Sequence, residues 1–448
     1  MKKMNTVMKK VLKRALLFLA FMTSALATYS QDETDGSESM YDLSLEDLLQ
    51  IELYDENFQL YGYINSNFEK VFSVPSIDSN GRTIKNQSAK EWSPIKAFHL
   101  YGQKNLSKRI SVLFNLAGSE DAIEVRNAWG NFKVIPEFQV RIGKMYRRFG
   151  LYNEKLDQIP TFIGIEPPEL FDGDHLFLTR TTDFMLHGEL SDKLTYAITT
   201  GNGEGGPIND VLPLGWDMRY KNADKKFTFG TSGYLSSIND NPSTSTVGFG
   251  EGSPKGGILP WMDADKFSVL GVFFEKKFGN FLIQSEYWTA SHKAVRNAAN
   301  TLEIVSNAGI NDKQRENFLG NNASKADVDL TEADVVTNVN YTASTFYVRL
   351  AYEIQTPKGQ IIPYVFYDWM SNNEVIQNKR YGGDNEAGFA DDGKFSKPSI
   401  GVVYRPISQV AIKLDGSMHS QTFNGKRENY PEIRADISFA FNALKGLR

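Results

Sequence analysis

The chain has 448 residues, no cysteine and a formal net charge of -5, and 41% of its residues are hydrophobic, with a mean hydropathy of -0.37. The negative mean hydropathy excludes a bundle of membrane-spanning helices, and the absence of cysteine excludes a disulfide-stapled secreted domain. The acidic balance argues against a nucleic-acid partner, because binding to a phosphate backbone requires clustered Lys and Arg.

The first thirty residues have the pattern of a secretory signal peptide. Six basic residues precede or begin the apolar run Ala15–Ala27, which ends in small residues. A membrane anchor is the alternative, but it needs ~20 apolar residues and this run is shorter. We expect residues 1–30 to be removed during export through the Sec pathway, with cleavage after Ala27 or after Ser30. Their removal takes away six basic and no acidic residues, which moves the net charge from -5 to -11.

Residues 31–57 form a predicted periplasmic segment with one short helix. Leu45, Leu48 and Leu49 recur at helical spacing, and Ser44 can cap the helix with Asp47 in its first turn. The sequence Ser-Leu-Glu-Asp-Leu-Leu resembles one that follows the signal peptide in many outer-membrane receptors energised by TonB. Such receptors have a plug domain and about 22 strands, and this chain is too short for both. We therefore expect a periplasmic helix, with plugging of the mouth of a barrel as the alternative.

From residue 58 to the C-terminus, about sixteen segments have the period-two alternation or the apolar character of β-strands. The alternation is clear in the last segment, where Ile433 and Phe439 share one face and Arg434 and Asp436 share the other. Two segments, Phe267–Phe278 and Gln360–Asn372, are apolar on both faces, so the pattern does not assign their inward side. The other predicted strands are Phe58–Phe68, Ile95–Asn105, Arg109–Leu116, Ala122–Phe132, Gln139–Gly143, Asp183–Leu190, Lys193–Thr199, Gly215–Lys221, Phe227–Ser237, Gly279–His292, Thr345–Ile354, Ser399–Arg405, Val410–Asp415 and Ile433–Asn442.

The connections between these strands alternate between short and long. Links of two to four residues, such as Gly279-Asn280, alternate with stretches such as Arg147–Thr182 and Lys293–Asn340. Among the outer connections, only Gly118-Ser119-Glu120-Asp121 is expected to be short. Short turns at one end and long loops at the other are typical of outer-membrane barrels. The sequence therefore predicts an all-β fold, a transmembrane antiparallel up-and-down β-barrel over residues 58–448 with short periplasmic turns and long extracellular loops.

No enzymatic constellation is present in the sequence. The five histidines show no metal-ligand spacing, and no G-x-S-x-G elbow occurs. The Gly-rich stretch Gly201–Gly206 leads into Pro207 rather than into a helix, which favours a flexible loop over a phosphate cradle. We expect no catalytic residue, no metal and no cofactor.

Charged residues occupy the face opposite the apolar face of the clear strands, so they are predicted to line the lumen. Arg109, Arg126 and Arg141 lie on consecutive strands and are expected to form one basic patch that influences ion selectivity. The alternative is that these arginines pair with acids and form an ordinary polar lining. The predicted inward set is Arg109, Glu124, Arg126, Arg141, Arg349, Glu353, Arg405, Lys413, Asp415, Arg434 and Asp436.

The third outer loop, Arg147–Thr182, is long and unusually apolar. Apolar loop residues require burial, and long loops without structure of their own are usually functional. Folding into the barrel would narrow the pore and turn the loop acids toward the basic wall, whereas packing on the rim or on a neighbouring subunit is the equal alternative. The charged pore candidates at this loop are Arg147, Arg148, Glu166, Glu169, Asp172 and Asp174.

The stretch Val140–Glu154 (VRIGKMYRRFGLYNE) resembles the strand-to-loop junction of porins in the phosphate-selective O and P superfamily, especially porin-like proteins of Bacteroidota. The matching positions are Gly143, Lys144, Phe149 and Gly150, and Arg148 stands where that family usually has proline. The resemblance implies a sixteen-stranded trimeric barrel that passes anions. It carries over no selectivity lysine.

These features together predict an outer-membrane channel for small hydrophilic solutes with a preference for anions. The expected partners are outer-membrane lipid and lipopolysaccharide, the solutes or anions themselves, and a homotrimer. The alternative is a barrel whose large loops bind a glycan, a surface lipoprotein or a secretion component. A lipid-acting barrel enzyme is a third hypothesis, although no Ser/His pair on the lipid-facing wall supports it.

Overall fold

The computed structural model describes residues 45, 58–77, 83–118, 122–168, 181–202, 212–224, 226–239, 259, 261–307, 310–372, 374, 385–386, 389–390, 394–423 and 426–442. The chain divides into residues 1–39 and 40–448, and all of the described residues belong to the second unit. The predicted signal peptide, residues 1–30, lies outside the described residues.

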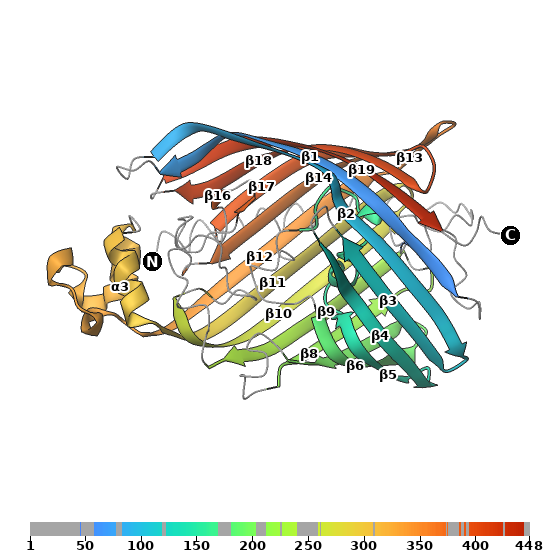
Figure 1. Ribbon diagram of the computed structural model, residues 1–448, viewed down its shortest axis with the longest axis horizontal. Helices are drawn as coiled ribbons and strands as arrows, with labels where there is room; N and C mark the ends of the chain where they lie inside the picture. Colours follow the sequence, from blue (N-terminus) through green and yellow to red (C-terminus); the bar gives the residue numbers. More distant parts are fainter. Residues whose placement is uncertain are drawn as a thin grey trace. The chain divides into compact units, whose positions relative to one another are not determined.

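Antiparallel strands pair in chain order and close into a sixteen-stranded barrel, because β19 returns to pair with β1 (Figure 1). Strand β13 continues β12 beyond Glu353, since both pair with β14. The barrel strands are β1 (Gln59–Ile77), β2 (Thr83–Ser107), β3 (Ile110–Gly118), β4 (Ile123–Ile135), β5 (Phe138–Tyr146), β6 (Thr181–Ser191), β7 (Leu194–Thr200), β8 (Leu214–Lys221), β9 (Phe227–Ile238), β10 (Met262–Phe278), β11 (Phe281–Arg296), β12 (Asn338–Tyr352) with β13 (Ile354–Thr356), β14 (Gly359–Asn372), β17 (Lys394–Arg405), β18 (Val410–Phe423) and β19 (Lys426–Asn442).

The predicted fold class is confirmed, and each predicted strand falls on one strand of the barrel. The strands next to the closure extend further than the alternation indicated, as in β1 (19 residues) and β2 (25 residues). The expectation of a single short outer connection was therefore wrong, because 78–82 and 424–425 are also short.

Side chains alternate between an apolar exterior and a largely polar interior. Ile400 and Leu414 point outward and are 68% and 52% exposed, whereas Lys413 and Arg434 point inward and are 1% and 2% exposed. An aqueous lumen and a lipid exterior require this opposition along each strand.

Two ends of the barrel differ in their connections. We call the end with the turns at 108–109, 136–137, 192–193 and 279–280 the short-turn end, and the end with the connections 147–180, 239–261 and 297–337 the long-loop end. A two-residue hairpin, β15 (Asn385–Glu386) with β16 (Phe389–Ala390), lies within the connection between β14 and β17.

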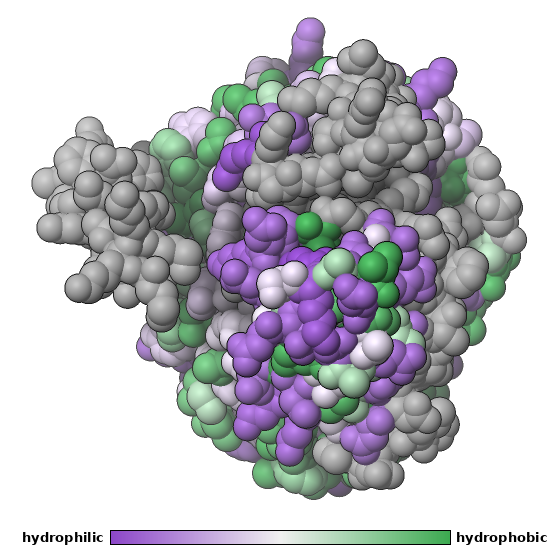
Figure 2. Space-filling view, turned by 90° about the vertical axis from the view of Figure 1, so that its left-hand side faces the viewer, coloured by the Kyte–Doolittle hydropathy of each residue, from purple (hydrophilic) through white to green (hydrophobic). Residues whose placement is uncertain are grey.

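The connection 297–337 is folded rather than extended. It contains α3 (Ala298–Asn307), α4 (Asp312–Leu319) and the 3-10 turns η6 (Gly320–Asn322), η7 (Asp327–Asp329) and η8 (Glu332–Asp334). The buried ion pair between Arg296 and Glu374, with Nε and Oε1 2.6 Å apart, ties the start of this connection to the segment after β14. Figure 2 faces this end of the molecule and shows a mainly hydrophilic described surface. Among the described residues, no helix is long and apolar enough to cross a membrane.

A charge on the outer wall tests which surface faces lipid. Leu270 is 51% exposed on β10, between Lys266 and Lys276 on the same face. We expect Leu270→Arg to lower the free energy of unfolding by ~2–4 kcal/mol, because it places a cation at the bilayer midplane. Urea titration of the barrel refolded into lipid vesicles measures the change. Lys276→Arg is the matched control, and equal stability of the two variants would contradict the assignment.

Candidate pore constriction

The third outer loop turns into the barrel directly after β5. We call its described part, residues 147–168, the inserted loop; it contains η1 (Asn153–Lys155) and η2 (Ile159–Thr161). At its start, the guanidinium of Arg147 lies 3.8 Å from the ring centre of Tyr234, and Arg148 Nε lies 3.1 Å from Asp217 Oδ1. Gly150 has a φ of 59°, a left-handed conformation that favours glycine and redirects the chain toward the lumen.

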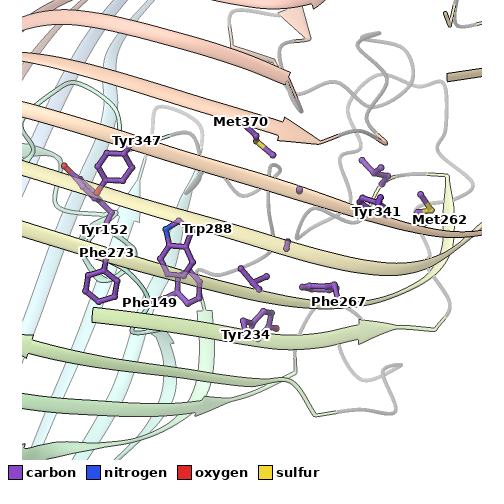
Figure 3. Packing of buried hydrophobic residues seen from close by; sticks show 14 of the residues in the cluster. Phe149, Tyr152, Tyr234, Met262, Phe267, Phe273, Trp288, Tyr341, Tyr347 and Met370 are labelled. Carbon is purple, nitrogen blue, oxygen red and sulfur yellow. The ribbon is translucent and has the colours of Figure 1, made fainter. Parts of the chain in front are cut away.

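Aromatic packing holds the first half of the inserted loop against the inner wall. The ring of Phe149 stacks on Trp288 of β11 with centroids 4.1 Å apart, and Tyr152 meets Tyr347 of β12 edge-on at 5.9 Å (Figure 3). A Cβ atom on Gly271 would lie 1.9 Å from the Trp288 ring, so the glycine makes the space that the indole occupies. Phe162 and Ile163 join the same buried cluster.

Hydrogen bonds to the same inner wall also fix the first half of the loop. The backbone N–H of Leu151 donates to Glu286 on β11 at 3.1 Å, and the Tyr152 hydroxyl donates to Gln284 at 3.2 Å. Glu286 also accepts from the Tyr347 hydroxyl at 2.7 Å and from Trp288 Nε1 at 3.2 Å. These bonds satisfy polar groups that would be costly to bury alone.

The second half of the loop reaches the other side of the barrel. On β3, the amide of Asn115 donates to the Asp157 carboxylate at 3.1 Å. On β18, Lys413 Nζ donates to the carbonyl oxygens of Ile159 at 2.6 Å and Gly164 at 3.0 Å. The inserted loop therefore crosses the lumen and contacts walls on opposite sides, which resolves the alternatives for residues 147–168 in favour of insertion.

Charge pairs link the loop to β8. Arg219 lies 2.7 Å from Asp217 and 3.2 Å from the carboxylate of Glu154 on the loop. Burial alone would raise the pKa of Glu154, but Arg219 and Arg148 hold that pKa below its ordinary value. Glu154 therefore keeps its charge, and its bond to Arg219, in neutral and mildly acidic solution.

On the inner wall formed by β12, β17, β18 and β19, some cations form ion pairs and others do not. Glu166 of the inserted loop pairs with Arg434 of β19 and lies 3.7 Å from Lys397 Nζ of β17. By contrast, no carboxylate among the described residues forms an ion pair with the three inward-facing cations Arg349, Lys413 and Arg405. We call these three residues the cation row.

The cation row follows the inner wall past the inserted loop. Arg349 is level with Ser399 of β17 through the register of β12, β14 and β17, and Lys413 is level with Val403. The row therefore extends from the level of Ser399 to Arg405, ~20 Å along β17. Arg405 is 4% exposed, and its Nη1 has no hydrogen-bond partner among the described residues. Lys413 lies opposite Asp436, yet its ammonium group turns to the loop carbonyls.

The expectation of one basic patch on β3, β4 and β5 was wrong. Arg109 is exposed in the turn at the short-turn end, level with Lys133 of β4. Arg141 is level with Asn131 of β4, where its guanidinium lies 4.1 Å from the ring centre of Trp129. Arg126 is five residues further along β4, ~16 Å away, and its Nη2 pairs with Glu124 at 3.0 Å. Neighbouring strands in the sequence do not place their arginines at one height.

Other predicted pore residues differ in position. Glu166 faces Arg434 and Lys397, not the arginines of β3 to β5, so the expected field between loop acids and that wall was also wrong for this residue. Arg147 and Arg148 anchor the root of the loop. Three loop acids lie outside the described residues: Glu169, Asp172 and Asp174.

Sequence reasoning missed the residues that receive the loop. Trp288, Glu286, Gln284 and Arg219 hold the inserted loop, and none was singled out. A usable signal existed, because Phe267–Phe278 and Gln360–Asn372 are apolar on both faces. A strand with an apolar inward face in a polar lumen indicates that something apolar covers it.

Leu45 from the N-terminal segment also lies inside the barrel. It is in a helical conformation, is 0% exposed and belongs to a buried cluster with Tyr61, Tyr63, Tyr101 and Ala440. Its backbone N–H donates to Oε1 of Gln158 in the inserted loop at 3.3 Å. At this residue, the contacts favour the plugging alternative, and the rest of 31–57 lies outside the described residues.

In the part of the chain that the structure describes, no group of His, Asp and Glu side chains is arranged to hold a metal ion.

No protein-family model matches the chain, and no curated protein matches its sequence. Solved structures do match its fold. The anion-selective porin from Comamonas acidovorans has 10% identity and a TM-score of 0.53, over 86% of this chain and 99% of that one. The outer membrane channel DcaP of Acinetobacter baumannii has 9% identity and a TM-score of 0.49, over 86% and 97%. OmpF of Salmonella typhi has 13% identity and a TM-score of 0.47, over 86% and 97%. At such identities, the likeness to the Comamonas porin shows a shared barrel fold.

Removing the Lys413 ammonium group should release the inserted loop. We expect trypsin to cleave folded Lys413→Met after Lys155 about tenfold faster than wild type, because each hydrogen bond to a charged group contributes ~1.5–3 kcal/mol. The cleavage rate is followed by mass spectrometry in detergent. Lys358→Met, in an exposed turn, is the matched control. A wild-type rate in a folded Lys413→Met barrel would show that these bonds do not hold the loop.

Proposed function

We propose that the protein is an outer-membrane channel for passive diffusion of small hydrophilic solutes, with a preference for anions. The observation that carries the preference is the cation row, Arg349, Lys413 and Arg405, on the inner wall beside the inserted loop. Cations without carboxylate partners leave a net positive potential, and in a lumen with low-dielectric walls this potential favours anions over cations.

The space beside the inserted loop is also lined by more cations than acids. A cavity of about 60 Å³ lies between the loop and strands β8 to β11. Its lining includes the cations Lys155, Arg219 and Lys221 together with the acid Glu275. A polar cavity of this size can hold water.

The location and assembly belong to the same proposal. The apolar exterior of a closed barrel fits the outer membrane, and residues 1–30 would direct export there. The short-turn end would then face the periplasm. The fold shared with an anion-selective porin supports the channel, and the Phe149-Gly150 turn supports kinship with the phosphate-selective O and P superfamily. A homotrimer and contact with lipopolysaccharide complete the proposal.

Arg405 provides the test. In planar bilayers under a salt gradient, we expect the wild-type reversal potential to show anion preference. Arg405→Gln should lower the anion-to-cation permeability ratio about threefold, equivalent to ~0.7 kcal/mol, because it removes a cation that no carboxylate neutralises. Arg109→Gln, in the exposed turn between β2 and β3, removes the same charge from strands outside the cation row and should leave the ratio unchanged.

Three results would contradict the proposal. A silent barrel would point to a binding or assembly role through the large loops. A cation-preferring wild type would reject anion preference, and equal effects of Arg405→Gln and Arg109→Gln would show that the cation row does not set selectivity.

A further inference from the structure

A groove on the outer wall lies outside the lumen and outside the constriction. It has a volume of about 720 Å³ and crosses strands β8 to β12 near the long-loop end. One row of register partners runs along it, with two leucines followed by three small hydroxyl side chains: Leu214, Leu235, Ser268, Ser291 and Thr342. Because the side chains at its centre are small, the groove stays open there. The two leucines form one apolar rim.

Two lysines face each other at the edge of this groove. Lys266 of β10 and Lys293 of β11 are direct register partners, and both are exposed on the outward face. Like charges directly opposite one another repel and destabilise a sheet. Within the described residues, neither ammonium group forms an ion pair, and no acidic residue lines the groove. The arrangement becomes favourable when an anion lies between the two ammonium groups.

The height of the lysines matches the boundary of a membrane. On the outward face of β10, the apolar residues Leu270 and Val272 lie between Lys266 and Lys276. These ten residues correspond to ~25 Å along the membrane normal at the tilt of barrel strands, the height of the apolar band. Lys266 and Lys293 therefore lie at the outer-leaflet interface. A single interfacial lysine extends toward water by itself, but that behaviour explains neither a facing pair nor a hollow lined with hydroxyls.

We infer that this groove binds the phosphorylated headgroup of an outer-leaflet lipid. The two ammonium groups take the phosphate, the hydroxyls of Ser268, Ser291 and Thr342 donate to headgroup oxygens, and an acyl chain lies over Leu214 and Leu235. The site would hold a lipid at one fixed position on the wall. The inference rests on the outer-membrane location proposed above and is independent of ion selectivity.

Lipid binding by the full chain tests the inference. The probe is purified bisphosphorylated lipid A, added to the folded protein in neutral detergent, with bound lipid counted by native mass spectrometry. We expect wild type to retain lipid A, and Lys266→Gln/Lys293→Gln to bind about 25-fold more weakly, because each of the two lysines near an anionic headgroup contributes about a factor of five. Lys266→Arg/Lys293→Arg should bind as wild type does.

The control removes the same kind of charge at the other interface. Lys276→Gln lies on the same face of β10, near the short-turn end, and should leave binding unchanged. Unchanged binding in the folded double glutamine variant, or equal loss in Lys276→Gln, would overturn the site. Full displacement of lipid A by inorganic phosphate alone would show a free-anion site instead. A silent channel that still binds lipid A through these lysines would reject only the proposed function.

Discussion

Closure of the sheet is the constraint on which the rest of this structure depends. In hydrocarbon, every backbone N–H and C=O must pair within the protein, so a sheet that crosses a membrane cannot keep a free edge. Pairing of β19 with β1 removes both edges at once. Closure then gives each strand one face toward lipid and one toward the lumen, and the opposite characters of neighbouring residues follow from it.

The inserted loop and part of the inner wall are two halves of one feature. The loop has apolar residues that an exposed loop could not keep, and β10 and β14 have apolar inward residues that a water-filled lumen would not stabilise. Each set buries the other: Phe149 and Phe162 of the loop belong to one buried cluster with Phe273 of β10 and Phe366 of β14. Fixing each loop residue costs ~1–2 kcal/mol of conformational entropy, while a buried aromatic side chain contributes ~1.5–3 kcal/mol and a hydrogen bond ~1 kcal/mol. The loop therefore needs both its aromatic contacts and its bonds to Glu286 and Lys413.

The strands could be predicted from the sequence more completely than the residues of the site. Alternation is local, so Ile433–Asn442 or Thr345–Ile354 can be recognised without knowledge of neighbours, and the asymmetry of the connections then indicates a transmembrane barrel. The height of a residue along the barrel is not local. Arg126 and Arg141 lie on adjacent strands, yet the register separates them by five residues along β4. Contacts between the inserted loop and the wall, such as Lys413 to Gly164, join residues 249 positions apart. No periodic pattern in the sequence predicts such contacts.

In the proposed channel, the cation row has two roles: it holds the inserted loop, and it provides the positive charge that would favour anions. Lys413 donates from its ammonium group to two loop carbonyls and forms no ion pair with a carboxylate among the described residues. Arg349 bonds to Gln284 and lies over the rings of Tyr152 and Phe366, again without a carboxylate. Among the described residues, Arg405 has neither a hydrogen-bonding carbonyl or amide nor an aromatic ring as a partner. An uncompensated cation in a low-dielectric wall costs several kcal/mol unless water or an anion reaches it. In the proposed channel, water and anions in the lumen would solvate Arg405. Its charge would then destabilise the barrel less than it would in a lumen without water.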